Sequence, residues 1–176
     1  MTARWLLTIL AGLSLSMPAH ARLQAQTSNG FSVVIEAQVS KSPKEAYDAF
    51  VSVGSWWDVS HSYSGKPENL KLHAVPGGAW LETLPNGGYV SHLLVTQADP
   101  GTRLVLNGGL GPLAFMGVSG AMTVTFAKTD TGTKVKLVYN VGGFDKDGFT
   151  AISKAVDGVL EGQFAHYVSY ANTGKP

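Results

Sequence analysis

The stretch from Gly148 to Ala171, GFTAISKAVDGVLEGQFAHYVSYA, carries a long helical pattern. Its larger side chains recur at steps of three and four residues, which is the period of one face of an α-helix. They are Phe149, Ile152, Val156, Val159, Leu160, Gln163, Phe164, Tyr167 and Ala171. Asp147 stands where an N-cap belongs, and Asn172-Thr173-Gly174 follows as a stop signal. We predict a terminal helix of about 24 residues, roughly 36 Å long, which can cross a small sheet.

A second side of this helix carries only small side chains. They are Ala151, Ala155, Gly158, Gly162, Ala165 and Ser169. Each glycine costs about 1 kcal/mol relative to alanine inside a helix. Two interpretations stay open: an exposed side without a role, or a surface that a loop, a partner or a ligand approaches closely.

The first 21 residues are typical of a signal peptide. Arg4 supplies the positive charge, 5–15 is an apolar segment too short to span a bilayer, and Ala19-His20-Ala21 is a small-x-small cleavage site. No cysteine follows this site, which excludes a lipid anchor on cysteine. We expect cleavage near Ala21 and a location in the bacterial periplasm or outside the cell.

Composition narrows the class of partner. Without Arg4 the 13 Lys and Arg residues fall to 12, equal to the 12 Asp and Glu residues. A neutral chain lacks the basic surface that nucleic acid or an acidic membrane requires, and no second apolar segment predicts a stable membrane anchor. The chain has no cysteine, so it has neither disulfides nor thiol chemistry. The length after the signal suits one domain with a sizeable core.

Strands and turns dominate the rest of the chain. After a polar leader at 22–29, alternation from Phe31 to Val39 predicts a strand with one apolar face. Ser42-Pro43-Lys44-Glu45 is a capping box that starts a short helix ending near Gly54, and Ser55-Trp56-Trp57 follows as a second short helix or turn. Further strands are expected at 70–75, 79–84, 89–98, 103–107, 121–128 and 134–141. This order predicts an α+β domain in which an antiparallel sheet of about six or seven strands wraps the terminal helix.

Five segments together resemble a known family. They are Ser42 to Phe50, Trp56-Trp57, Pro76 to Glu82, Asp99 to Leu104 and Gly132 to Leu137, followed by the long helix. Their order and spacing resemble the START-like helix-grip superfamily, also called SRPBCC, and within it the branch of polyketide cyclases and activators of the heat-shock-protein ATPase. The resemblance covers a single domain at 30–172 and leaves 173–176 as a tail.

The resemblance implies a curved sheet that grips the C-terminal helix and leaves an apolar cavity for lipids, polyketides, hormones or other hydrophobic ligands. Some members are cyclases or lyases and many are binders, so the fold alone does not determine the function. The co-chaperone role is not transferred, because its partner is an ATP-dependent cytosolic machine from which a signal peptide would separate this chain.

Glu82 and His92 lie on neighbouring hairpin strands that are otherwise apolar. A two-residue turn at Asn86-Gly87 would place Glu82 opposite Ser91, whereas a three-residue loop at 86–88 would place it opposite His92. Turned inward and opposed, the two form a carboxylate–imidazole pair suited to acid–base chemistry. Burial would then raise the carboxylate pKa, and an imidazolium would lower it. The alternative is a solvated pair on the outer face.

Aromatic residues supply the other candidates for a ligand site. The loop after the first helix holds Trp56, Trp57, His61 and Tyr63, which could line a cavity mouth or simply divide between core and surface. The apolar segment at 108–117 is either a mobile flap or a loop packed on the sheet. The full set of candidate ligand-binding residues is Trp56, Trp57, His61, Tyr63, Trp80, Glu82, His92, Phe115, Tyr139, Phe164 and Tyr167.

Metal and nucleophile chemistry find little support. His61, His73, Glu82 and His92 lack the close spacings of metal ligands, so we expect no metal and no cofactor. No serine stands in a Gly-x-Ser-x-Gly context, and no paired glycines have the lysine of a phosphate loop.

The sequence therefore favours a binding protein for a small hydrophobic molecule, lipid or aromatic, without covalent chemistry. An enzyme of the cyclase, lyase or hydrolase kind, with Glu82 and His92 as acid and base, is the first alternative. The second is an interaction module that uses the small side of the last helix, and a homodimer is left open.

Overall fold

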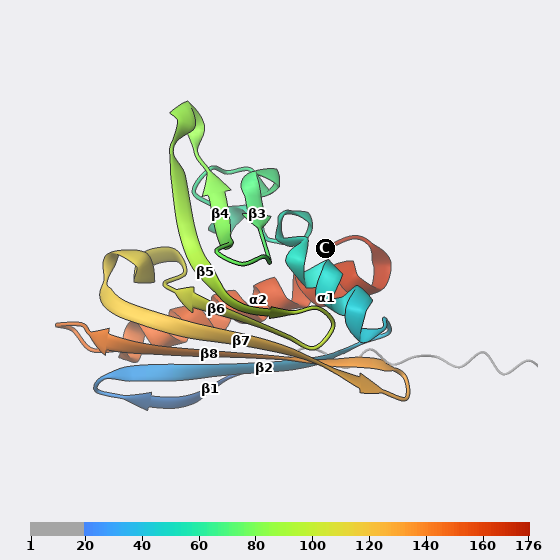
Figure 1. Ribbon diagram of the computed structural model, residues 1–176. Helices are drawn as coiled ribbons and strands as arrows, with labels where there is room; N and C mark the ends of the chain where they lie inside the picture. Colours follow the sequence, from blue (N-terminus) through green and yellow to red (C-terminus); the bar gives the residue numbers. More distant parts are fainter. Residues whose placement is uncertain (1–19) are drawn as a thin grey trace, which may run out of the picture.

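The computed structural model describes residues 20–176, which form one antiparallel sheet and a long C-terminal helix (Figure 1). The α+β class and the terminal helix are confirmed. The predicted signal peptide, except for its last two residues, lies outside the described residues. Within 20–176 no helix is long and apolar enough to cross a membrane.

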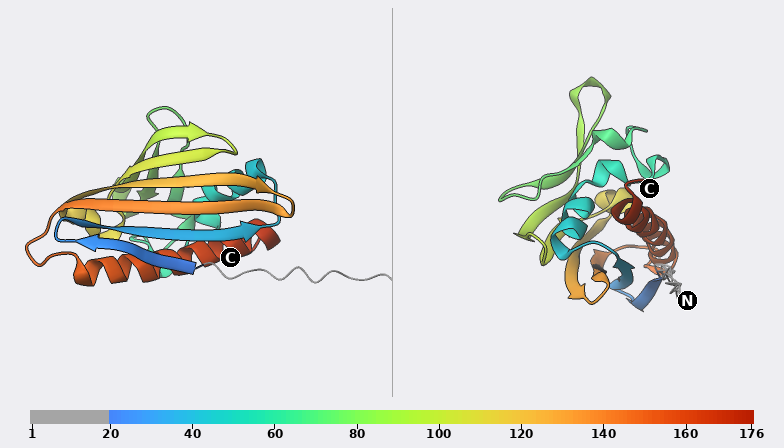
Figure 2. Two further views of the ribbon diagram at one scale, coloured as in Figure 1. Left: turned by 90° about the horizontal axis from the view of Figure 1, so that it is seen from below. Right: turned by 90° about the vertical axis from the view of Figure 1, so that its right-hand side faces the viewer.

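The sheet has eight strands in the order β1-β2-β8-β7-β6-β5-β4-β3, with every neighbouring pair antiparallel. The strands are β1 (His20–Thr27), β2 (Gly30–Val39), β3 (Leu70–Leu72), β4 (Ala79–Thr83), β5 (Tyr89–Asp99), β6 (Arg103–Gly108), β7 (Gly117–Thr129) and β8 (Gly132–Phe144). β2 pairs with the last strand, β8, so segments from both ends of the domain lie side by side, one strand in from the β1 edge of the sheet. The terminal helix lies against one face of the sheet (Figure 2).

The predicted strand number is too low, because the polar leader at 22–29 is largely a strand. β1 pairs with β2 from His20↔Glu36 to Thr27↔Gly30. β1 is an edge strand, so it needs backbone hydrogen bonds on one side only. Most of its described side chains are exposed, and its sequence therefore shows no apolar alternation that would predict a strand.

α1 (Pro43–Val51) begins as predicted. The Ser42 backbone N–H donates to Glu45 Oε2 at 3.0 Å, and the Glu45 N–H donates to Ser42 Oγ at 3.4 Å, which completes the capping box. The helix ends three residues before Gly54, and single 3₁₀ turns follow in place of a second helix. They are η1 (Val53–Ser55), η2 (Val59–His61) and η3 (Pro67–Asn69), with η4 (Pro85–Gly87) and η5 (Gly111–Phe115) further along the chain.

α2 (Thr150–Thr173) buries the face that its periodicity predicts, including Val156, Leu160, Phe164 and Tyr167. The predicted cap is wrong: Phe149 holds the N-cap position without a side-chain bond, and Asp147 pairs instead with Lys146. Gly174 ends the helix in the left-handed region, with φ 78°.

The small side of α2 faces outward. A Cβ built on Gly158 or Gly162 would meet no atom within 4 Å, and Ala151, Ala155 and Ala165 are exposed. Packing against the sheet therefore does not explain these glycines.

Candidate functional site

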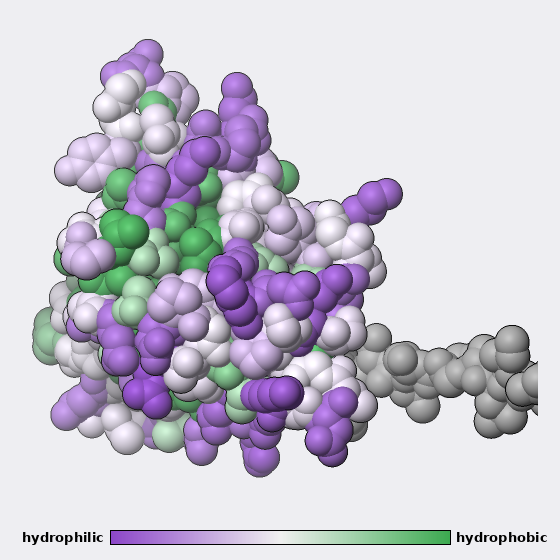
Figure 3. Space-filling view, turned by 45° about the vertical axis from the view of Figure 1, so that its right-hand side comes forward, coloured by the Kyte–Doolittle hydropathy of each residue, from purple (hydrophilic) through white to green (hydrophobic). Residues whose placement is uncertain are grey.

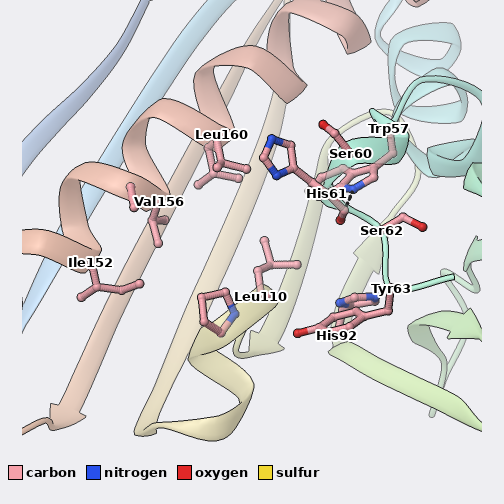
Figure 4. A pocket seen from close by; sticks show the side chains of 14 residues that line it. Trp57, Ser60, His61, Ser62, Tyr63, His92, Leu110, Ile152, Val156 and Leu160 are labelled. Carbon is pink, nitrogen blue, oxygen red and sulfur yellow. Dashed lines mark hydrogen bonds between the residues drawn. The ribbon is translucent and has the colours of Figure 1, made fainter. Parts of the chain in front are cut away.

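A cavity of about 320 Å³ lies between α2, the loop after α1, β5 and η5 (Figure 4). α2 supplies its aliphatic wall, with Ile152, Ala155, Val156, Val159 and Leu160. The loop supplies Trp57, Ser60, His61, Ser62 and Tyr63, and β5 supplies His92. η5 supplies Gly111 and Pro112, and Leu110 precedes it. The cavity thus joins segments that are up to about a hundred residues apart in the chain, which only the tertiary fold brings together.

Four of the predicted ligand-binding residues line this cavity: Trp57, His61, Tyr63 and His92. The remaining seven lie elsewhere. Trp56, Trp80, Tyr139, Phe164 and Tyr167 are core residues, Glu82 is buried next to His92, and Phe115 is 78% exposed.

Sequence reasoning missed Ser60 and Ser62 as lining residues. It considered 108–117 as a flap or a packed loop without naming 110–112 as ligand-binding residues, and it treated the apolar positions of α2 as one uniform face. The periodicity of the helix was a usable signal for Ile152, Val156 and Leu160, but it does not tell where the sheet leaves the helix uncovered.

Three hydrogen bonds fix the first part of the loop that forms the aromatic wall, residues 57–61. Trp57 Nε1 donates to the His61 carbonyl at 3.0 Å, and Ser60 N donates to Asp58 Oδ1 at 2.9 Å. The Asp58 N–H donates to Gln163 Oε1 at 2.8 Å, which fixes the loop to α2. Trp57 also packs edge-on against Trp80, with ring centroids 4.9 Å apart.

Glu82 and His92 are both buried, and His92 Nε2 lies 3.1 Å from Glu82 Oε2. The outer-face alternative is therefore wrong. Both predicted registers are wrong as well: the Leu84 N–H bonds to the Gly88 carbonyl, so the loop starts at Pro85 and Glu82 pairs with Val90.

A β-bulge lies at His92. Leu81 pairs with Ser91 and Trp80 pairs with Leu93, so His92 is the extra residue of β5. A bulge re-aims side chains, and here both His92 and Leu93 are buried instead of alternating between the two faces. Because Glu82 pairs with Val90, His92 two residues further along β5 already shares its face, and the bulge turns Leu93 to that face as well.

The carboxylate of Glu82 is ionised. Burial alone would raise its pKa, but hydrogen bonds from Ser64 and Ser62 outweigh burial and lower the pKa to about 2. Ser62 Oγ donates to Oε1 at 2.8 Å and the Ser64 N–H donates to the same oxygen at 2.5 Å, while Oε2 faces His92. Burial raises the carboxylate pKa as expected, but the net lowering comes from these donors, which the expectation omitted, and not from an imidazolium.

His92 is neutral at pH 7. Burial lowers the pKa of its imidazole, and the neighbouring Glu82 only partly offsets this effect. Because an ionised carboxylate can only accept hydrogen bonds, Nε2 carries the proton and Nδ1 keeps a lone pair. The ring lies against Tyr63, with centroids 5.8 Å apart and an interplanar angle of 31°.

The segment at 108–117 is anchored to the sheet. Tyr139 Oη donates to the Gly108 carbonyl at 2.9 Å and accepts from the Leu110 N–H at 3.2 Å. Leu110 and Leu113 are buried, which agrees with a packed loop better than with a free flap. Burial raises the pKa of Tyr139 to about 12, so its hydroxyl stays protonated at neutral pH.

An exposed aromatic side chain, Phe115, packs on Tyr63 at the cavity wall. Tyr63 is 45% exposed and Phe115 is 78% exposed, and their rings pack edge-to-face with centroids 6.4 Å apart. Figure 3 shows apolar areas broken up by polar groups on the face that it presents. Within residues 20–176 no three His, Asp or Glu side chains gather in a way that could hold a metal ion.

No family model matches the chain, and no curated protein matches it in sequence. Solved structures do match its fold. A conserved protein of unknown function from Enterococcus faecalis has a TM-score of 0.60 at 12% identity, covering 90% of this chain and 79% of that one.

An uncharacterised protein from Rhizobium leguminosarum has a TM-score of 0.61 at 16% identity, over 88% of this chain and 98% of that one. CalU16 from Micromonospora echinospora has a TM-score of 0.57 at 11% identity, over 91% and 87%. At these identities the likeness shows the fold alone.

Proposed function

We propose that this chain is a START-like helix-grip protein that binds a small hydrophobic molecule in the cavity, in the periplasm or outside the cell. The cavity itself is the observation that supports the proposal: about 320 Å³, walled by aliphatic side chains of α2 and aromatic side chains of the loop, with a few polar groups. Ligand sites usually occupy about 300–1,000 Å³ and have this composition. A volume at the lower end favours a compact aromatic or short-chain molecule over a long lipid.

Native mass spectrometry of the mature protein, purified from its own periplasm and followed by organic extraction, tests the proposal. A stoichiometric small molecule supports it and identifies the ligand class. An empty protein that also binds nothing in a panel of bicyclic aromatics and short fatty acids would contradict it.

A matched pair of variants locates the binding. Val159→Trp places a large side chain at the cavity wall, so we expect it to displace the ligand. Ala165→Trp adds the same side chain on the exposed side of α2, outside the lining, and should leave binding unchanged. Equal effects of both variants would place the ligand elsewhere.

The pair Glu82–His92 favours a second candidate, an enzyme. A buried carboxylate that orients a neutral imidazole at a cavity wall can support proton removal from a bound molecule, with Glu82 stabilising the imidazolium that forms. In the binder Glu82→Gln changes affinity only, whereas in the enzyme it abolishes turnover. The masses of the extracted ligand before and after incubation with wild-type protein distinguish the two.

A further inference from the structure

We propose that the cavity selects ligands that donate a hydrogen bond, from a phenol-like or enol-like hydroxyl, to Nδ1 of His92. Such ligands would bind in preference to ethers and carboxylates of the same shape. The inference rests on the proposed binding function and adds the chemical class of the ligand.

The first step is the direction of the hydrogen bond between His92 and Glu82. Both oxygens of Glu82 are occupied: Oε1 accepts from Ser62 Oγ and from the Ser64 N–H, and Oε2 faces His92 Nε2 at 3.1 Å. The carboxylate offers no proton, so Nε2 must donate. In a neutral imidazole the other nitrogen is then an acceptor, and the lowered pKa of His92 agrees with the neutral form.

The second step is the accessibility of Nδ1. Across the described residues, no backbone or side-chain group bonds to it. Three polar side-chain atoms in this part of the chain are fully buried and have no hydrogen-bond partner: Tyr47 Oη, Trp80 Nε1 and Asp157 Oδ1. Nδ1 of His92 also has no partner but is not among them, so it is not fully buried. His92 is only 5% exposed and lines the cavity, so its open acceptor faces the cavity.

The third step is the shape of the space in front of this acceptor. The rings of Tyr63 and His92 lie against each other on one side, and Ile152 and Val156 lie across from them on α2 (Figure 4). An aromatic wall facing an aliphatic wall suits a flat ring. A carboxylate ligand would instead bring a negative charge toward an acceptor that is backed by the ionised Glu82, which disfavours it.

The experiment compares three probes of one shape: 2-naphthol, 2-methoxynaphthalene and 2-naphthoate, titrated by calorimetry at pH 7.5. We expect wild-type protein to bind 2-naphthol about tenfold or more tighter than the methyl ether, because only the naphthol donates. The naphthoate should bind weakest. Equal affinity for naphthol and ether would overturn the inference while leaving cavity binding intact, whereas no binding of any probe would overturn both.

Two variants and a control test the role of His92. His92→Phe keeps a ring at the wall without an acceptor, so the preference for naphthol should disappear. Glu82→Gln should reduce or reverse the preference for naphthol. Ser62 and Ser64 would hold the amide oxygen, so the amide NH₂ would face Nε2 and donate to it. The imidazole proton then moves to Nδ1, which no longer accepts a hydrogen bond. His73→Phe, at an exposed position outside the lining, should keep the wild-type preference. Retained preference in His92→Phe would overturn the inference, and wild-type probe titrations decide it even if a variant does not fold.

Discussion

His92 Nε2 lies 3.1 Å from Glu82 Oε2, although the sheet pairs Glu82 with Val90 and leaves His92 without a partner strand residue. The Glu82–Val90 register puts His92, two residues beyond Val90, on the same face as Glu82, and the β-bulge turns Leu93 to that face as well. A regular ladder would have placed His92 and Leu93 on opposite faces. The acid–imidazole pair therefore depends on the strand register, and the bulge adds Leu93 to the buried face beside it.

The pair makes folding stability depend on pH. Glu82 has a folded-state pKa of about 2, below its ordinary 4.5, so it stabilises the fold above pH 4.5 and this contribution is lost as pH falls toward 2. The shift corresponds to about 3 kcal/mol at most. Burial also lowers the pKa of His92, so protonation of His92 below its ordinary 6.5 opposes folding in the same direction.

Urea unfolding at pH 7, 5, 4 and 3 measures this effect. Glu82→Gln should show a flatter loss of unfolding free energy between pH 5 and pH 3 than wild type does. Glu68→Gln changes an exposed carboxylate that makes no side-chain hydrogen bond or ion pair within residues 20–176, so it should follow the wild-type curve more closely. Parallel curves for wild type and Glu82→Gln would show that Glu82 does not carry this dependence.

Ser62→Ala removes one donor to Glu82 without touching the imidazole. The pKa of Glu82 should rise, and the loss of a hydrogen bond to a charged group should lower the unfolding free energy by about 1.5–3 kcal/mol. Ser55→Ala is the matched control, because Ser55 is exposed and its hydroxyl makes no hydrogen bond within residues 20–176. Equal stabilities of the two variants would contradict the role given to Ser62.

Tyr139→Phe removes the hydroxyl that bonds Gly108 and Leu110. Two backbone groups lose their partner, so we expect a loss of about 1–3 kcal/mol and faster hydrogen exchange of the Leu110 amide. Tyr170→Phe is a suitable control, because within the described chain the Tyr170 hydroxyl makes no hydrogen bond. Unchanged exchange in the η5 segment would show that Leu110 and Leu113 hold it without Tyr139.

Two glycine-to-alanine substitutions should have opposite effects. A Cβ on Gly120 would lie 2.4 Å from Cε2 of Tyr139, so Gly120→Ala should destabilise by about 1–3 kcal/mol. Gly158→Ala adds a methyl group to open space inside a helix and should stabilise by about 0.5–1 kcal/mol. Thermal and urea unfolding measure both, and destabilisation by Gly158→Ala would reveal a contact on the small side of α2.

The sequence alone determined the elements whose signals are local. The period of α2 and the capping box at Ser42 each depend on residues within a few positions of one another, so they identify the terminal helix and the start of α1. β1 was not predicted because an exposed edge strand has no apolar period. The N-cap of α2 was predicted wrongly at Asp147, because the Asp147 carboxylate pairs with Lys146 and Phe149 holds the N-cap position.

Only the tertiary structure decided the site. Sequence reasoning selected Glu82 and His92 as a pair, but the strand register determines whether they share a face, and a shift of one residue would separate them. The donors from Ser62 and Ser64, which set the charge of Glu82, come from a loop about twenty residues earlier. Cavity walls are likewise assembled from contacts distant in the chain, and no local pattern encodes such contacts.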